Sequence, residues 1–235
     1  MSRLWPERLR IALSPAQIAV GDRTIDCDPG FGNEPWQGAV AALRSLEINK
    51  PCKCTIVLSN HFVRYAVVPW SDALGTAAEE DAYIRHHFAK IHGERAKSWV
   101  LRASAGGGAE RLASAIDAAL LEEIRASFPK GGKASLVSVQ PQLMAAINQW
   151  RKAIPPGGAW LVLADSDRAC VALHSGGGWR SVQVGKGGWL GLLERERFRL
   201  NGGIEGGFPE LVLLAGAAAP PRDATQGWQF RELAA

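Results

Sequence analysis

The sequence predicts an α/β protein built from two lobes, and the main evidence is a strand pattern that occurs twice. One copy covers residues 9–27 and the other covers residues 159–184. In each copy, short runs rich in β-forming residues are divided by turn residues, which is typical of an antiparallel three-stranded meander. Helical and single-strand patterns follow each copy. A topology that recurs within one chain indicates two similarly built halves.

The second copy has polar turns with distinct chemistry. Its apolar runs, 160–164 and 169–173, are separated by Asp165-Ser166-Asp167, and Ser175-Gly176-Gly177-Gly178 leads into an alternating run at 180–184. The first turn therefore places carboxylates directly after a buried strand, whereas the second turn is a glycine loop.

The first copy has the same arrangement with different turn residues. Strands are expected at 9–13, 17–20 and 23–27, and they are divided by Ser14-Pro15-Ala16 and Gly21-Asp22. This first turn contains neither a carboxylate nor a glycine.

The remaining elements are predicted from apolar spacing, capping residues and turn residues. The predicted helices are 36–46, 76–91, 117–128, 141–150 and 189–200. Thr76 and Glu79 have the spacing of a capping box at the start of one helix. The other predicted strands are 54–58, 62–68, 96–104, 111–116, 135–139 and 211–214, with a short edge strand at 228–233. The first two of these are expected to form a hairpin around Ser59-Asn60-His61.

A linker divides the two predicted lobes. Pro155-Pro156-Gly157-Gly158 is the clearest break in the chain, because proline and glycine together disfavour regular structure. The expected domains are a first lobe at 1–154, with an inserted subdomain at about 71–105, and a reduced second lobe at 157–235.

Composition indicates an ordinary globular protein. The 235 residues are 47% hydrophobic and 21% charged, so the chain can bury a sizeable core. The net charge is +4, but the basic residues are scattered, and no run is dense enough for a nucleic-acid-binding arm.

The cysteines and the apolar runs favour a cytoplasmic setting. Cys27, Cys52, Cys54 and Cys170 are expected to be free thiols, because no signal peptide precedes them. No apolar run reaches the roughly 20 residues that span a bilayer. The Cys52-x-Cys54 pair lacks the two further ligands that a zinc site needs.

Other polar groups are interpreted as structural. His86, His87 and His92 do not share one helical face with the nearby acidic residues, so a solvated helix is favoured over a metal site. The triglycines at 106–108 and 176–178 fit hairpin turns and not the strand-to-helix entries that cradle phosphate. Ser59-Asn60-His61 lacks an evident carboxylate partner for a catalytic triad.

Nine tryptophans are more than expected, and core packing explains most of them. Trp70, Trp179 and Trp228 are candidates for exposed anchors of a protein partner.

The order of elements points to a known fold. Two halves of meander, helix, strand, helix and strand follow the logic of the actin-like and ribonuclease-H-like folds. The run from Thr55 to Pro69, the acidic helix from Glu79 to Phe88 and the segment Val137–Leu143 resemble the pilus-assembly PilM family. They are equally similar to the pilus-biogenesis protein MshI and to the cytoplasmic part of the type II secretion L component (GspL). The resemblance implies a two-lobed actin-like fold with a small inserted subdomain and a reduced second lobe.

The resemblance also shows where a nucleotide site would lie. ATP-binding members have phosphate loops at the two meander turns and a later glycine segment at the adenosine. Here the first turn, Ala12-Leu13-Ser14, lacks both carboxylate and glycine, and Pro15 removes a backbone donor. The second keeps Asp165 but has Asp167 where glycine is expected, and the adenosine segment keeps only Gly216. Asp165 and Gly216 are therefore interpreted as vestigial nucleotide positions, and ATP hydrolysis is not expected.

The resemblance implies a non-catalytic scaffold or adaptor of a bacterial type IV pilus or type II secretion-like assembly. Such a protein would bind a cytoplasmic segment of an inner-membrane partner and possess no catalytic residue, metal or cofactor of its own. An assembly ATPase is a further expected partner, whereas nucleic acid and direct membrane insertion are not expected. The protein would lie at the cytoplasmic face of the inner membrane, recruited there by a partner.

Two other functions remain open. One is an ATP-binding switch in the same machinery, with Mg²⁺ and nucleotide closing the cleft between lobes. The other is a ribonuclease-H-like nuclease, which would need several converging carboxylates, whereas only Asp165 and Asp167 lie at a meander turn.

Overall fold

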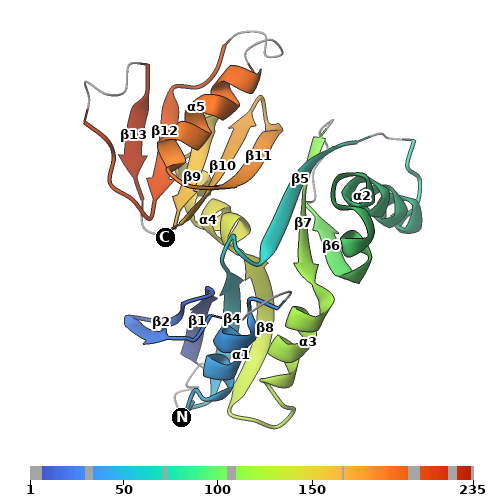
Figure 1. Ribbon diagram of the computed structural model, residues 1–235, viewed down its shortest axis with the longest axis vertical. Helices are drawn as coiled ribbons and strands as arrows, with labels where there is room; N and C mark the ends of the chain where they lie inside the picture. Colours follow the sequence, from blue (N-terminus) through green and yellow to red (C-terminus); the bar gives the residue numbers. More distant parts are fainter. Residues whose placement is uncertain are drawn as a thin grey trace, which may run out of the picture. The chain divides into compact units, whose positions relative to one another are not determined.

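Two five-stranded sheets with the same internal order form the framework of the protein (Figure 1). The computed structural model describes residues 7–29, 34–70, 73–104, 110–165, 167–200, 207–221 and 227–233. The first sheet has the order β3-β2-β1-β4-β8 and the second has the order β11-β10-β9-β12-β13. In each sheet an antiparallel meander is extended by two parallel strands. The predicted duplication of topology is therefore confirmed.

The first sheet is built from a meander and two strands that come later in the chain. Its strands are β1 (Glu7–Leu13), β2 (Gln17–Val20), β3 (Arg23–Asp26), β4 (Cys52–Leu58) and β8 (Ala134–Pro141). In β1 the buried Ile11 and Leu13 alternate with the less buried Arg10 and Ala12, as expected for a strand with one buried face. β4 ends in a continuous buried run, which is typical of a central parallel strand covered on both faces.

The second sheet repeats this arrangement. Its strands are β9 (Ala159–Ala164), β10 (Arg168–Ser175), β11 (Gly178–Lys186), β12 (Leu211–Ala215) and β13 (Gln229–Glu232). One face of the sheet carries a core cluster that includes Trp160, Leu193 and Trp228. The predicted edge strand near the end of the chain is confirmed as β13, which pairs in parallel with β12.

Five α-helices occur in the described part of the chain. They are α1 (Gln37–Arg44), α2 (Ala77–His92), α3 (Ala118–Ala126), α4 (Gln142–Trp150) and α5 (Trp189–Leu200). Each sheet has one helix directly after its meander, α1 in the first and α5 in the second, and α5 packs on β9, β10 and β11. None of the helices in the described ranges is long and apolar enough to cross a membrane.

The helix starts agree with the capping residues in the sequence. Thr76 Oγ1 accepts from the Glu79 N–H at 3.2 Å, and Glu79 Oε2 accepts from the Thr76 N–H at 2.9 Å, which completes the predicted capping box of α2. Asp117 Oδ1 accepts from the Ala119 N–H at 2.9 Å and caps α3.

A third, three-stranded sheet corrects the predicted hairpin. It has the order β5-β7-β6, formed by β5 (Val63–Pro69), β7 (Glu110–Asp117) and β6 (Trp99–Ala103). β4 and β5 thus belong to different sheets, and the hairpin prediction was wrong. The physical reason is that the Ser59 N–H donates to Leu13 O at 2.9 Å, so the end of β4 is tied to the first meander and does not turn back on itself.

The predicted strand at 96–104 is shorter in the structure. A 3₁₀ helix covers Gly93–Ser98, and β6 begins only at Trp99. Gly93, with φ of 63°, ends α2 in a conformation that favours glycine. The predicted turn at 106–108 lies outside the described residues.

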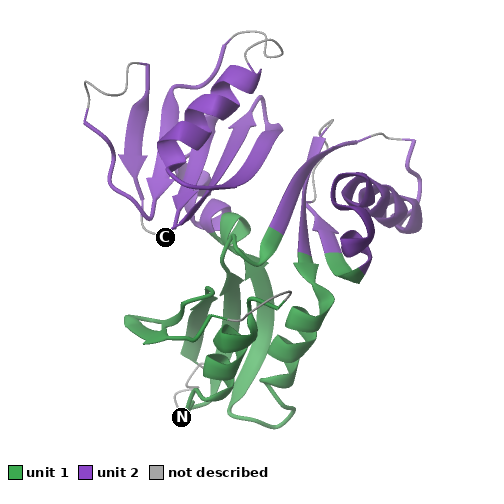
Figure 2. Cartoon of the chain, in the orientation of Figure 1, with its two compact units in different colours: residues 1–63, 98–100, 116–145 green, residues 64–97, 101–115, 146–235 purple. Residues whose placement is uncertain are grey.

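The chain forms two compact units (Figure 2). Unit 1 comprises residues 1–63, 98–100 and 116–145, and unit 2 comprises 64–97, 101–115 and 146–235. Residues 64–97, which include α2, belong to the same unit as the second sheet.

Candidate functional site

The turns that open the two meanders are closed by equivalent strand pairs and hydrogen bonds. Leu13 pairs with Ile18 across the first turn, and Ala164 pairs with Ala169 across the second. The Ser14 N–H donates to Gln17 O at 2.9 Å, and the Asp165 N–H donates to Arg168 O at 2.7 Å. The resemblance places the phosphate loops at these two turns. The groups in each turn can therefore be compared with those that bind phosphate.

The first turn fits a phosphate poorly. The Ser14 N–H and hydroxyl both donate to Gln17 O, the hydroxyl at 2.8 Å, so neither is directed at a ligand. Pro15 has no N–H to donate. A phosphate loop needs several backbone donors that point outwards, and a magnesium ion needs oxygen ligands such as carboxylates. Ser14-Pro15-Ala16 supplies no carboxylate.

The second turn keeps negative charge and lacks glycine. Asp165 is half-buried and Asp167 is exposed. The Asp167 carbonyl accepts from the Gly187 N–H at 3.1 Å, which ties the turn to the end of β11. Two carboxylates that stand two residues apart in the sequence disfavour an unshielded phosphate at this turn.

Gly216 lies next to the second turn. Leu163 pairs with Ala215, so the residue after β12 faces the end of β9. A Cβ atom built on Gly216 would lie 2.0 Å from Ala164 O, and its φ is +82°. The structure therefore brings Gly216 close to Asp165 in the chain's second sheet. Backbone packing alone is sufficient to explain why a glycine stands there.

The first sheet has a polar cluster at the matching position after β4. Asn60 and Ser59 are buried, at 1% and 7% exposure. Asn60 Nδ2 donates to Gln142 Oε1 at 3.1 Å, and Ser59 Oγ lies 3.3 Å from His61 Nδ1. The Asn60–Gln142 pair was missed by sequence reasoning, because the partners are 82 residues apart and no local pattern connects them. The cluster holds the start of α4 against the end of β4.

The histidines of α2 lie as expected for a helix surface. His86 is exposed, whereas burial lowers the pKa of His87 and of His92, with nearby positive charges adding to the effect. His92 stacks on Phe88 with ring centroids 5.9 Å apart. Within the described ranges, no three His, Cys, Asp or Glu side chains come together as a metal site would require.

The buried thiols of Cys54 and Cys170 are poor nucleophiles and poor metal ligands. All four cysteines are free, and Cys52 Sγ lies 3.5 Å from Cys54 Sγ. Burial, reinforced by Cys52, raises the pKa of Cys54 to about 12, and burial also raises the pKa of Cys170. Both thiols stay protonated at neutral pH, whereas the thiolate is the reactive form.

Two of the three tryptophans proposed as partner anchors are buried. Trp179 and Trp228 are each only 8% exposed, so their prediction as surface anchors was wrong. Trp179 packs edge-on against His174, and Trp228 packs edge-on against Trp160. Trp70 is half-buried, and the Arg111 guanidinium lies 3.4 Å from its ring centroid.

Comparisons with known proteins identify the fold. No protein-family model and no curated protein sequence matches the chain. A chain of the PilM–PilN type IV pilus biogenesis complex matches with a TM-score of 0.69 and 14% identity, over 97% of this chain and 88% of that one. The cytoplasmic domain of EpsL, an inner-membrane component of the Vibrio cholerae type II secretion system, matches with a TM-score of 0.56 and 14% identity, over 96% and 89%.

A third similar structure is described as having an actin-like ATPase fold. It is a Bacteroides thetaiotaomicron protein of actin-like ATPase fold and unknown function, with a TM-score of 0.55 and 12% identity, over 93% of this chain and 84% of that chain. The protein therefore has an actin-like ATPase fold, and the resemblance seen in the order of its sequence elements is confirmed at the level of structure.

Proposed function

We propose that the protein is a non-catalytic actin-like scaffold of a type IV pilus or type II secretion-like assembly. The proposal rests on one observation, which is the set of hydrogen-bonding and charged groups in the two equivalent turns. One has its Ser14 donors bonded within the turn and a proline beside them, and the other replaces glycine with a second carboxylate. Turns of this kind are poorly equipped to hold a metal–triphosphate. The fold is then retained for binding other proteins.

The partner under this proposal is a cytoplasmic segment of an inner-membrane assembly protein. Support comes from the two similar structures, since one is a complex of PilM with PilN and the other is the cytoplasmic domain of an inner-membrane component. An extended segment can add to the edge of a sheet, where backbone hydrogen bonds give affinity and side-chain pockets give specificity. An assembly ATPase is a further proposed partner.

The direct test measures binding of candidate segments. Cytoplasmic segments of the inner-membrane proteins encoded beside the gene are synthesised and titrated into the protein by calorimetry, with and without Mg²⁺-ATP. We expect one segment to bind with an affinity that Mg²⁺-ATP does not change. If no segment binds unless Mg²⁺-ATP is present, the proposal fails in favour of an ATP-binding switch.

A melting experiment tests the nucleotide site by itself. A ligand that binds only the folded protein raises the melting temperature in a concentration-dependent way. We expect Mg²⁺-ATP to cause no saturable rise, and Asp165→Ala to leave partner binding largely intact. A saturable rise that Asp165→Ala abolishes would show a working nucleotide site and overturn the non-catalytic interpretation.

A further inference from the structure

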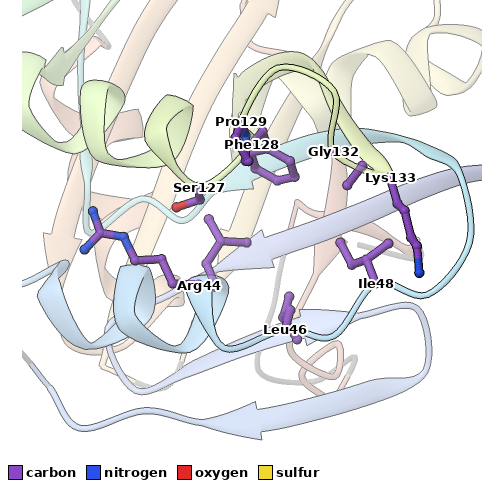
Figure 3. A pocket seen from close by; sticks show the side chains of 10 residues that line it. Arg44, Leu46, Ile48, Ser127, Phe128, Pro129, Gly132 and Lys133 are labelled. Atoms are coloured by element: carbon purple, nitrogen blue, oxygen red, sulfur yellow. The ribbon is translucent and has the colours of Figure 1, made fainter.

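Unit 1 contains a cavity that the candidate site does not use (Figure 3). It has a volume of about 300 Å³ and lies between the end of α1, the chain that follows it, and the loop between α3 and β8. Figure 3 shows Phe128 and Pro129 on one side of the cavity, with Leu46 and Ile48 opposite them.

The interior of the cavity is mainly apolar. Leu43, at 4% exposure, is buried, whereas Leu46, Ile48 and Phe128 are only half-buried. Large apolar side chains that are partly exposed favour a further apolar group in the hollow between them. Each Å² of apolar surface removed from water stabilises the bound state by about 25 cal/mol. Pockets of this size and composition are typical places for a bound side chain.

The polar groups that line the cavity are mostly engaged already. Arg44 forms an ion pair with Glu123, and the Ser127 hydroxyl donates to Glu123 O at 2.9 Å. Lys133 is exposed, and among the described residues no carboxylate forms an ion pair with it. Lys130 is exposed in the same loop but does not line the cavity. Lys133 therefore leaves one positive charge without an ion pair at the rim.

We propose that this cavity is a docking site for an acidic segment of a partner protein. One or two large apolar side chains of the segment would fill the hollow, and a neighbouring Asp or Glu would pair with Lys133. A small cofactor fits less well, because such sites need several convergent polar groups, and here Lys133 is the main group still available. A membrane surface fits less well because it takes apolar side chains that protrude, whereas these line a hollow. The proposal does not depend on the assembly role.

The test begins with a random-peptide phage library selected on the intact protein. Enriched peptides are synthesised with a fluorescent label, and their affinities are measured for the wild type, Lys133→Glu and Lys130→Glu. We expect enriched peptides to place Leu, Phe or Trp beside Asp or Glu. Lys133→Glu should weaken binding about tenfold or more, since a close charge pair is lost and a repulsive one gained. Lys130→Glu should weaken binding by about threefold or less, because screening in salt reduces longer-range attraction.

Further variants and probes make the outcome decisive. Phe128→Ala should also weaken the selected peptide about tenfold, and Ile48→Ala replaces it if melting shows that Phe128→Ala is unfolded. Equal effects of Lys133→Glu and Lys130→Glu, or enriched peptides without acidic residues, would overturn the proposal. So would binding of phosphatidylglycerol vesicles that Lys133→Glu abolishes while no peptide is enriched, since that result assigns the cavity to a membrane.

Discussion

At Gly216 the backbone after β12 runs so close to β9 that a side chain cannot be added without a shift. We predict that Gly216→Ala lowers the free energy of unfolding by about 3 kcal/mol, because a methyl group collides with Ala164 O and the positive φ disfavours alanine. Thermal and urea unfolding measure the loss.

Gly207 offers a matched control for this substitution. Its φ is +81°, almost the value at Gly216, but a Cβ built there has nothing within 4 Å. Gly207→Ala should therefore cost only about 1 kcal/mol, the backbone part of the penalty. Equal losses in the two variants would show that the close approach to Ala164 does not explain the glycine.

Glu196 is a buried carboxylate that attaches α5 to its sheet. It is 3% exposed, accepts from the Ser181 hydroxyl and pairs with Arg199. We predict that Glu196→Gln lowers the free energy of unfolding at neutral pH by about 2 kcal/mol, because the buried carboxylate loses its charge-assisted hydrogen bond with Arg199. The exposed Glu122→Gln on α3 is the control and should change little.

The same carboxylate predicts a pH dependence. Burial favours a higher pKa for Glu196, but hydrogen bonds from Arg199 and Ser181, with the Arg199 charge, outweigh it and lower the pKa. A lowered folded-state pKa gives stability that is present above the unfolded-state pKa and is lost as the pH falls through the folded value. The difference between wild type and Glu196→Gln should shrink between about pH 5 and pH 3. A difference that stays constant over this range would contradict the assignment.

Residue roles were only partly predictable from the sequence. Gly216 was singled out through the resemblance, as the remnant of an adenosine segment, but the steric reason for a glycine depends on Ala164, a residue from another strand. Trp179 and Trp228 stand near strand ends, where burial and exposure are equally compatible with the sequence. Their burial follows from contacts with His174 and Trp160, which no local pattern shows.

At the scale of single elements, the start of α2 gives a clean test of local sequence signals. We predict that Thr76→Ala lowers stability by about 1 kcal/mol, because the Glu79 N–H loses its side-chain acceptor. Thr76→Ser keeps the hydroxyl and should restore most of the loss. Hydrogen exchange of the first turn of α2 measures the effect. If this turn exchanges as fast in Thr76→Ser as in Thr76→Ala, the capping role is contradicted.

The elements themselves were more predictable than their partners. Turn chemistry and periodicity located both meanders and all five helices, because those signals are local. The hairpin between 54–58 and 62–68 was wrong because strand pairing is not local. The continuous buried run of β4 was the available signal, since it is typical of a central parallel strand and untypical of half of an exposed hairpin.

At the scale of the whole molecule, the duplicated strand order predicts that each sheet has its own stabilising contacts. Removing residues 227–235 deletes β13 and Trp228, whose ring lies 5.9 Å from that of Trp160. We predict that the truncated chain loses hydrogen-exchange protection in β9 and β12, because β12 becomes an edge strand and the core cluster loses an indole worth about 3–5 kcal/mol. Strands β1 and β4 belong to the other unit and should keep their protection.

Two comparisons separate the causes in this experiment. Trp228→Ala retains β13 and should reproduce the loss in β9 with less effect on β12, since the strand pairing from Leu211 to Leu214 survives. Mass spectrometry of peptic fragments reports both sheets in one measurement. If protection falls equally in β1 and β4, the two sheets unfold as one cooperative body. The duplicated topology would then describe how the chain is built without describing how it is stabilised.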